Sequence, residues 1–248
     1  MLAHEVVGSG ERLVFVHGFT QTRRSWDLIA RELIDQYEIV AIDAPNHGES
    51  HDLNYNLTNG ADAIVDVGRI ATYVGYSMGG RLCLNAALAY PESVKRLILI
   101  SSTAGIDDPT NRAERIKNDE ALASRIEKIG VAAFVDEWLA RPMFAGLTPK
   151  TAHRDLRLAN TATGLATSLR LCGTGTQEPL LRRVSQLMMP VLVMVGENDS
   201  KFVALARQLV DAIGDNATLR IIPNSGHSPH LEQPKLFLEA LREFLTTN

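Results

Sequence analysis

A serine between glycines is the first group in this sequence that could carry chemistry. It lies in Gly75-Tyr76-Ser77-Met78-Gly79, between a predicted strand at residues 70–74 and a predicted helix at residues 80–90. In this G-x-S-x-G pattern the serine occupies a strained strand-to-helix turn, and glycines avoid β-carbons that would collide with neighbouring backbone. A glycine-rich turn with an incidental serine is the alternative. The flanking strand and helix favour a reactive hydroxyl on Ser77, projecting above a sheet.

Such a serine needs a base, and the base needs a carboxylate that orients it. The expected chain order is serine, then acid, then histidine, and Asp199 and His227 satisfy it. Each follows a predicted strand, and open α/β sheets bind their ligands at the carboxyl ends of strands. We therefore predict a triad of Ser77, Asp199 and His227. Glu197 and His230 lie on the same two loops and remain alternatives for the acid and the base.

Two backbone N–H groups are candidates for an oxyanion hole. One donor normally follows the nucleophile and the other comes from an early strand-to-helix loop, which here indicates Met78 and Phe19. His17 could pass for a catalytic histidine, but it precedes the serine in the chain and is predicted to hold its loop by hydrogen bonding, as is His47. The spacing of the histidines suggests no metal pair, so we expect no metal site.

The surrounding sequence predicts an α/β fold that would position these groups. Short apolar runs rich in β-branched residues fit strands buried on both faces of a parallel sheet. These runs are at residues 13–16, 39–42, 97–100 and 191–195. Stretches of helical periodicity are at residues 25–37, 80–90 and 234–245. Strands that alternate with helices indicate an α/β architecture with a mostly parallel sheet.

One region breaks this alternation. Between residues 103 and 178 there is no convincing buried strand. Residues 119–128 instead read as a helix charged on one side, and residues 131–139 as an apolar helical segment. We therefore expect a single domain, residues 1–248, with a helical cap inserted at about residues 103–178.

Composition excludes several classes of protein. The 248 residues are 45% hydrophobic, enough for a large core without disulfides or a metal. The formal charge is −4 without a like-charge run, which argues against nucleic-acid binding. Cys83 and Cys172 form no disulfide framework, and no apolar run approaches ~18 residues. We expect a soluble cytoplasmic protein without a signal peptide, membrane partner or nucleic-acid partner, and either a monomer or a small homo-oligomer.

These motifs resemble the α/β-hydrolase superfamily along the whole chain. The resemblance is carried by residues 17–19, residues 43–50, the serine motif, residues 196–199 and Gly226-His227. The chain departs from the usual pattern at residues 21–24, at Asn46, where a glycine is usual, and in a short segment at residues 59–68.

A second resemblance is narrower. Residues 75–81, 164–170, 173–175 and 229–234, with Gly196-Glu197 and Lys201-Phe202, are similar to the 2-succinyl-6-hydroxy-2,4-cyclohexadiene-1-carboxylate synthases of menaquinone biosynthesis. The resemblance implies a lyase that removes a ring proton beside a ketone and expels pyruvate from an enolpyruvyl ether, without a cofactor. The implied substrate, 2-succinyl-5-enolpyruvyl-6-hydroxy-3-cyclohexene-1-carboxylate, is a small polycarboxylate.

The resemblance also indicates which side chains would bind that substrate. Arginine suits a carboxylate because its planar guanidinium forms two parallel hydrogen bonds. Arg81, Arg115 and Arg157 match the family's arginines, and Arg112 is an alternative to Arg115. Aromatic residues expected at the pocket are Tyr76, Trp138 and Phe144. Two other functions remain open at this point: a small-molecule serine hydrolase acting on an ester or carbon–carbon bond, and a ligand-binding protein on the same fold.

Overall fold

The computed structural model describes residues 1–247 and is built around one seven-stranded sheet. The strands lie in the order β1-β3-β2-β4-β5-β6-β7 and pair in parallel, except that β1 runs antiparallel to β3. The bounds are β1 His4–Gly8, β2 Glu11–Val16, β3 Tyr37–Ile42, β4 Ala71–Tyr76, β5 Val94–Ile100, β6 Val191–Gly196 and β7 Ala217–Ile222. The predicted mostly parallel α/β sheet is confirmed, and each of the apolar runs is a strand.

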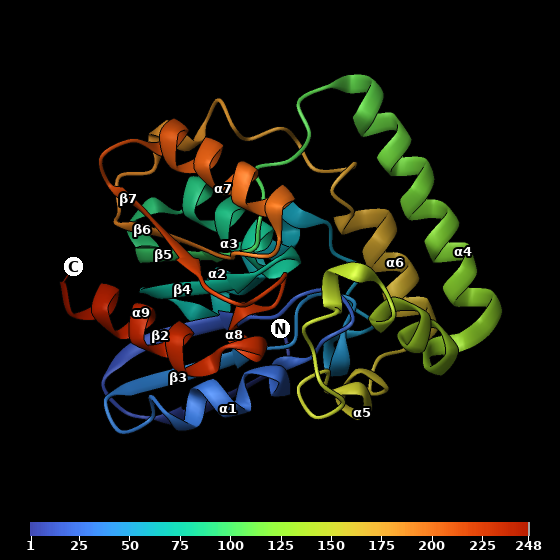
Figure 1. Cartoon of the computed structure of the whole chain (residues 1–248), viewed down its shortest axis with the longest axis horizontal. Coiled ribbons are helices and arrows are strands. Elements are labelled where there is room, and N and C mark those ends of the chain that lie inside the picture. The colour runs from blue at the N-terminus through green and yellow to red at the C-terminus, as the bar shows by residue number, and fades with distance from the viewer. Residues whose placement is uncertain (248) are drawn as a thin grey trace.

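Helices cover both faces of the sheet (Figure 1). Helices α2, α3 and α7 lie on one face and α1 and α9 on the other. The bounds are α1 Asp27–Arg31, α2 Leu57–Gly68, α3 Met78–Ala89, α4 Pro109–Leu139, α5 Arg154–Arg157, α6 Ala162–Cys172, α7 Ser200–Ile213, α8 Pro229–Glu232 and α9 Pro234–Thr247. Within residues 1–247, no helix is both long and apolar enough to cross a bilayer.

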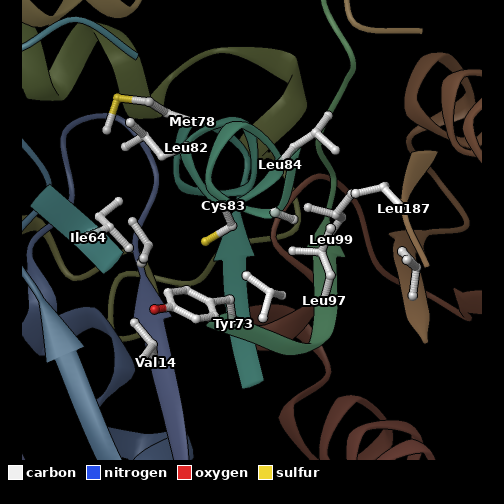
Figure 2. Close-up of a cluster of buried hydrophobic side chains, with 14 of the residues drawn as sticks. Val14, Ile64, Tyr73, Met78, Leu82, Cys83, Leu84, Leu97, Leu99 and Leu187 are labelled. Carbon is white, nitrogen blue, oxygen red and sulfur yellow. The ribbon is translucent and has the colours of Figure 1, made fainter. Parts of the chain in front are cut away.

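The residues of the central strands are apolar without alternation because both faces of the sheet are buried there. In β2, Val14 joins the cluster under α2 and α3, whereas Phe15 packs on the opposite face beside Trp26. Figure 2 shows the first cluster, in which Cys83 of α3 points towards Tyr73 of β4. The two clusters hold the central strands rigidly, and the carboxyl ends of those strands therefore form a fixed platform.

The predicted helix at residues 25–37 is wrong in its extent. A 3₁₀ turn at Arg23–Trp26 leads into α1, which ends at Arg31, and residues 32–36 form turns. The chain has to reverse before β3 begins at Tyr37, so no continuous helix fits. Trp26, Ile29 and Leu33 are nevertheless buried. The apolar spacing thus predicted the buried face correctly but not the backbone conformation.

The region between β5 and β6 contains helices and, within the described residues, no strand. Helix α4 is interrupted at Gly130, whose φ of 78° and ψ of 169° are not helical, so it consists of two helical stretches. A small apolar cluster joins α4 to α6. We call residues 103–178 the cap. Its α4, α5 and α6 lie together on one side of the molecule, apart from the helices that flank the sheet (Figure 1).

The two ends of the cap meet at its base. The N–H of Leu180 donates to the carbonyl of Ala104 at 2.7 Å. The strands that precede and follow the cap, β5 and β6, are themselves hydrogen-bonded neighbours. The cap therefore leaves the sheet and returns to it at nearly the same place.

Candidate active site

Ser77 lies in the turn that links β4 to α3, because β4 ends at Tyr76 and α3 begins at Met78. Its φ of 52° and ψ of −108° put a non-glycine residue in the left-handed region, which costs of order 1–3 kcal/mol. The neighbouring glycines are required by close contacts. A β-carbon on Gly75 would lie 2.5 Å from the carbonyl oxygen of Gly79, and one on Gly79 would lie 2.2 Å from that of Val16.

The structure brings Ser77, His227 and Asp199 together. The Oγ of Ser77 lies 3.2 Å from Nε2 of His227, whose Nδ1 lies 2.7 Å from Oδ2 of Asp199. The predicted alternatives lie elsewhere. Glu197 accepts a hydrogen bond from the N–H of Asn224, and His230 has no hydrogen-bond partner within residues 1–247.

Local structure fixes the acid and the base. Asp199 caps the N-terminus of α7 with Oδ1, which accepts from the N–H of Phe202 at 3.4 Å and leaves Oδ2 for His227. The His227 loop is held by Glu232, which accepts from the N–H groups of Gly226 and Ser228 at 2.7 and 3.0 Å. A carboxylate on Nδ1 selects the tautomer in which Nε2 can accept the serine proton.

The two N–H groups predicted for the oxyanion hole are free. Met78 is the first residue of α3, so its N–H has no partner inside the helix. In the part of the chain that the structure describes, neither this N–H nor that of Phe19 has an acceptor. Both residues line the same cavity as Ser77. This geometry suits an oxygen that becomes negatively charged during a reaction.

His17 and His47 brace the loops near this site, as the sequence predicted. Nδ1 of His17 donates to the Gly18 carbonyl at 2.8 Å, and Nε2 accepts from the N–H of Ala44 at 3.0 Å. Nδ1 of His47 donates to the Pro45 carbonyl, and Nε2 accepts from the N–H of Thr20. Each ring acts as donor and acceptor, so each is held in its neutral form.

Buried histidines predict an acid-sensitive fold. Burial lowers the pKa of His47 to about 3, and burial also lowers the pKa of His230. The contribution of these neutral histidines to the free energy of unfolding is greatest above about pH 6.5, the pKa of an unfolded histidine. It is lost as the pH falls towards the lower folded values, because the unfolded chain then binds more protons. Each group adds a slope of about 1.4 kcal/mol per pH unit.

The wild-type protein should lose free energy of unfolding between about pH 7 and pH 5, and the His230→Phe variant should lose less of it, as measured by urea titration at each pH. Phenylalanine suits this position, because the His230 ring packs against the rings of Trp26 and Tyr76 and has no hydrogen bond within residues 1–247. His51→Gln, on the surface, is the control. An unchanged pH dependence in His230→Phe would contradict the assignment of this group.

A cavity of about 730 Å³ lies between the cap and the sheet. Asp199 contacts His227 but does not itself line the cavity, whereas every other residue predicted for the site does. These residues are Phe19, Tyr76, Ser77, Met78, Arg81, Arg115, Trp138, Phe144, Arg157 and His227. Within residues 1–247 no cluster of three or more potential ligands could hold a metal ion.

Two of the arginines are buried without a counter-charge. Arg81 is 7% exposed and reaches only Oε1 of Gln177, at 3.4 Å. Arg157 is 1% exposed and donates to the Ala152 carbonyl and to the hydroxyl of Thr20. Its Nη2 has no partner in the described chain, and neither arginine forms an ion pair there. Burial lowers the pKa of each to about 10.

This arrangement points to an anionic ligand, because a buried cation without a partner is costly. A bound carboxylate would supply the missing acceptors for Arg81 and Arg157. Arg115 differs, since its side chain is 38% exposed and its Nε donates to Asp119 at 2.8 Å. Arg112, the sequence-level alternative to Arg115, does not line the cavity.

Aromatic rings form the apolar side of the cavity. Trp138 packs on Phe19 at 5.2 Å between centroids and on Phe144 at 5.8 Å. Phe144 in turn contacts the ring of His227 at 6.2 Å. Tyr76 donates to or accepts from the hydroxyl of Ser228 at 2.7 Å, and burial raises its pKa. An apolar ring with attached carboxylates would match this wall and the arginines.

Three other cations line the cavity, Arg125, Arg141 and Lys201, and the sequence assigned a binding role to none of them. Lys201 follows Asp199 by two residues, and that proximity is a signal that could have found it. The neighbouring Phe202 packs edge-on against His227 at 4.5 Å. Arg141 lies three residues after Trp138 and two residues after the end of α4, and no motif marks it.

Comparison with known proteins defines the class. The alpha/beta hydrolase family matches residues 13–240 of this chain, and the sheet order and the Ser77 turn agree with that match. The chain is 32% identical over 264 residues to the 2-succinyl-6-hydroxy-2,4-cyclohexadiene-1-carboxylate synthase of Serratia proteamaculans (strain 568), covering 99% of this chain and 98% of that one. It is 36% identical over 260 residues to a Bacillus subtilis (strain 168) protein given the same name provisionally, covering 99% and 94%.

Solved structures agree with these relatives. The structure of MenH from S. aureus superposes with a TM-score of 0.91 at 31% identity, covering 98% of this chain and 97% of that one. A malate-bound thermophilic esterase from Thermogutta terrifontis superposes with a TM-score of 0.87 at 25% identity, covering 99% and 93%. The chain belongs to the α/β-hydrolase family and, within it, to the family of 2-succinyl-6-hydroxy-2,4-cyclohexadiene-1-carboxylate synthases.

Proposed function

We propose that the protein is a carbon–oxygen lyase of menaquinone biosynthesis. It eliminates pyruvate from 2-succinyl-5-enolpyruvyl-6-hydroxy-3-cyclohexene-1-carboxylate and releases 2-succinyl-6-hydroxy-2,4-cyclohexadiene-1-carboxylate. Family membership supports this reaction. The observation that carries it is the pair of buried, unpaired arginines, Arg81 and Arg157, in the cavity that also holds Ser77. A substrate with three carboxylates suits these cations, and a neutral ester would leave them without counter-charges.

In this proposal Ser77 acts as the base. Asp199 orients His227, and His227 takes the proton of Ser77 so that the alkoxide removes the acidic ring proton beside the succinyl ketone. The N–H groups of Phe19 and Met78 stabilise the negative charge that develops on the ketone oxygen. Electrons then move through the ring alkene and break the carbon–oxygen bond to the enolpyruvyl group. The enolate of pyruvate leaves, and protonated His227 can return the proton.

The arginines hold the substrate in position. Arg81 and Arg157 approach the cavity from α3 and α5, on opposite sides of the boundary between the sheet and the cap. Carboxylates bound to both would orient the ring proton towards Ser77, and such orientation lowers the entropic part of the barrier. The aromatic wall around Trp138 would cover the ring and exclude water.

The mechanism predicts that no covalent intermediate forms on Ser77. Mass spectrometry of enzyme quenched during turnover should show unmodified protein, because the serine only exchanges a proton. Deuterium at the abstracted ring position should slow turnover if that step limits the rate. A substrate-derived adduct on Ser77 that forms and decays at the turnover rate would contradict the elimination route.

A serine hydrolase is the second candidate, because the same three residues and N–H groups could form and cleave an acyl-serine. The similarity to the structure of an esterase supports this second candidate. The two functions separate when kcat/KM is measured for a chromogenic ester and for the enolpyruvyl compound. A higher value for the ester, together with an acyl-serine, would identify a hydrolase.

We further propose that the protein works in the cytoplasm on a small molecule. Both thiols, Cys83 and Cys172, are free and buried, which agrees with a reducing compartment. Burial raises the pKa of Cys172 to about 12, so this thiol at the cavity wall stays protonated.

A further inference from the structure

Arg141 has an unusual environment for an arginine at the end of a surface helix. Its guanidinium carbon lies 4.4 Å from the ring centroid of Trp138, in the wall of the cavity. Within residues 1–247 its side chain forms no hydrogen bond and no ion pair. The stacking leaves the edge of the guanidinium, where its donors lie, without acceptors.

The nearest candidate acid is already engaged. Glu137 lies one turn before Arg141, but its two carboxylate oxygens accept from Arg125 at 2.5 and 3.3 Å. The charge that acts on Arg141 most strongly is another cation, Arg115. Burial lowers the pKa of Arg141, and the positive charge of Arg115 lowers it further. Arg115 and Arg141 thus line the same cavity, and their like charges oppose each other.

Arg115 also has hydrogen-bond donors that no protein group accepts within residues 1–247. Only its Nε contacts Asp119, so its two terminal nitrogens have no partner in the described part of the chain. Arg115 and Arg141 are both half-buried, whereas Arg81 and Arg157 are buried. Among the cations of the cavity, Arg81 and Arg157 are thus a buried pair, and Arg115 and Arg141 are more accessible to solvent.

We propose that Arg141 binds a carboxylate of the substrate together with Arg115, and that this pair forms a separate carboxylate subsite at the solvent side of the cavity. A planar anion between the two guanidinium groups would relieve their repulsion and accept bidentate hydrogen bonds. The inference deepens the proposed function, because it rests on a polycarboxylate substrate. In this role Arg141 determines specificity, because it favours substrates with three carboxylates over substrates with two.

Direct binding tests this subsite without relying on turnover. Tricarballylate, a tricarboxylate, serves as the probe, with titration calorimetry for the Kd and tryptophan fluorescence for the site. The chain has two tryptophans, and Trp26 is fully buried and does not line the cavity, so a ligand-dependent change reports on Trp138. Arg141→Gln should weaken tricarballylate binding about tenfold, and Arg141→Lys should restore part of it.

Arg112→Gln is the matched control, since it removes the same charge from α4 at a residue that does not line the cavity. With the enolpyruvyl substrate, Arg141→Gln should raise KM and leave kcat nearly unchanged, as expected for uniform binding. Equal Kd values for Arg141→Gln and Arg112→Gln would overturn the subsite. Wild-type protein that binds tricarballylate through Arg141 but does not release pyruvate would instead refute the proposed function alone.

Discussion

Ser77→Ala should lower kcat by about 10²–10⁴-fold, the usual contribution of a positioned acid–base group. The substitution removes the oxygen that lies 3.2 Å from Nε2 of His227 and that we propose as the proton acceptor. A φ of 52° strains the backbone of alanine as much as that of serine, so the free energy of unfolding should change little. Steady-state pyruvate release and urea unfolding measure the two effects.

A second serine provides the control for this experiment. Ser168 of α6 also lines the cavity, but its hydroxyl contacts the sulfur of Met78 and not His227. Ser168→Ala should therefore lose far less activity than Ser77→Ala. Near-normal turnover in Ser77→Ala would remove the serine from the mechanism and leave His227 as the direct base.

Arg157→Gln should raise KM by about 10–150-fold, which corresponds to a lost charged contact of about 1.5–3 kcal/mol. The reason is burial. With 1% exposure and no ion pair within residues 1–247, Arg157 offers a ligand a charge that water does not screen. The unliganded protein should keep most of its stability, because the wild type already bears the cost of burying this charge.

Arg154 is a suitable comparison for Arg157, since it belongs to the same short helix but points outward. It forms an exposed ion pair with Asp136, and such pairs contribute little. Arg154→Gln should leave KM unchanged. If both variants show the same KM, Arg157 has a structural role only, and the anionic-substrate proposal loses its main support.

The success of the strand predictions has a simple physical basis. The central strands are buried on both faces, and this burial requires uninterrupted apolar runs that are visible in the sequence. Strand β1 was missed for the same reason. It lies at the edge of the sheet, all five of its residues are exposed, and the sequence His4–Gly8 carries no apolar run. Its pairing with β3 depends on tertiary context that a local pattern does not contain.

The candidate site shows the same contrast between residues that a local pattern reveals and residues that depend on tertiary contacts. Ser77, Asp199 and His227 were found because the strand-to-helix turn and the strand ends impose a spacing and an order on them. Arg141 was not predicted, because the role that we propose for it depends on three-dimensional contacts that no motif marks. These are its stacking on Trp138, the engagement of Glu137 elsewhere and the charge of Arg115.

Asn46 marks a smaller departure that the structure explains. The sequence placed it where related chains usually have glycine. Its φ of 68° is left-handed, and asparagine tolerates this region better than most residues. The loop therefore keeps its course without a glycine, and His47 can still accept the hydrogen bond from Thr20.

The hydrogen bond between Leu180 and Ala104 has a consequence for how this architecture can change during evolution. Because the inserted segment starts and ends at adjacent points, its removal or replacement need not alter the pairing of β5 with β6. Closing a loop between ends that are already in contact depends only weakly on its length. Replacing the segment that carries Arg115, Arg141 and Arg157 would therefore leave Ser77, Asp199 and His227, which lie on the loops at the strand ends, in place. New substrate preferences can arise by grafting a different module onto unchanged acid–base machinery.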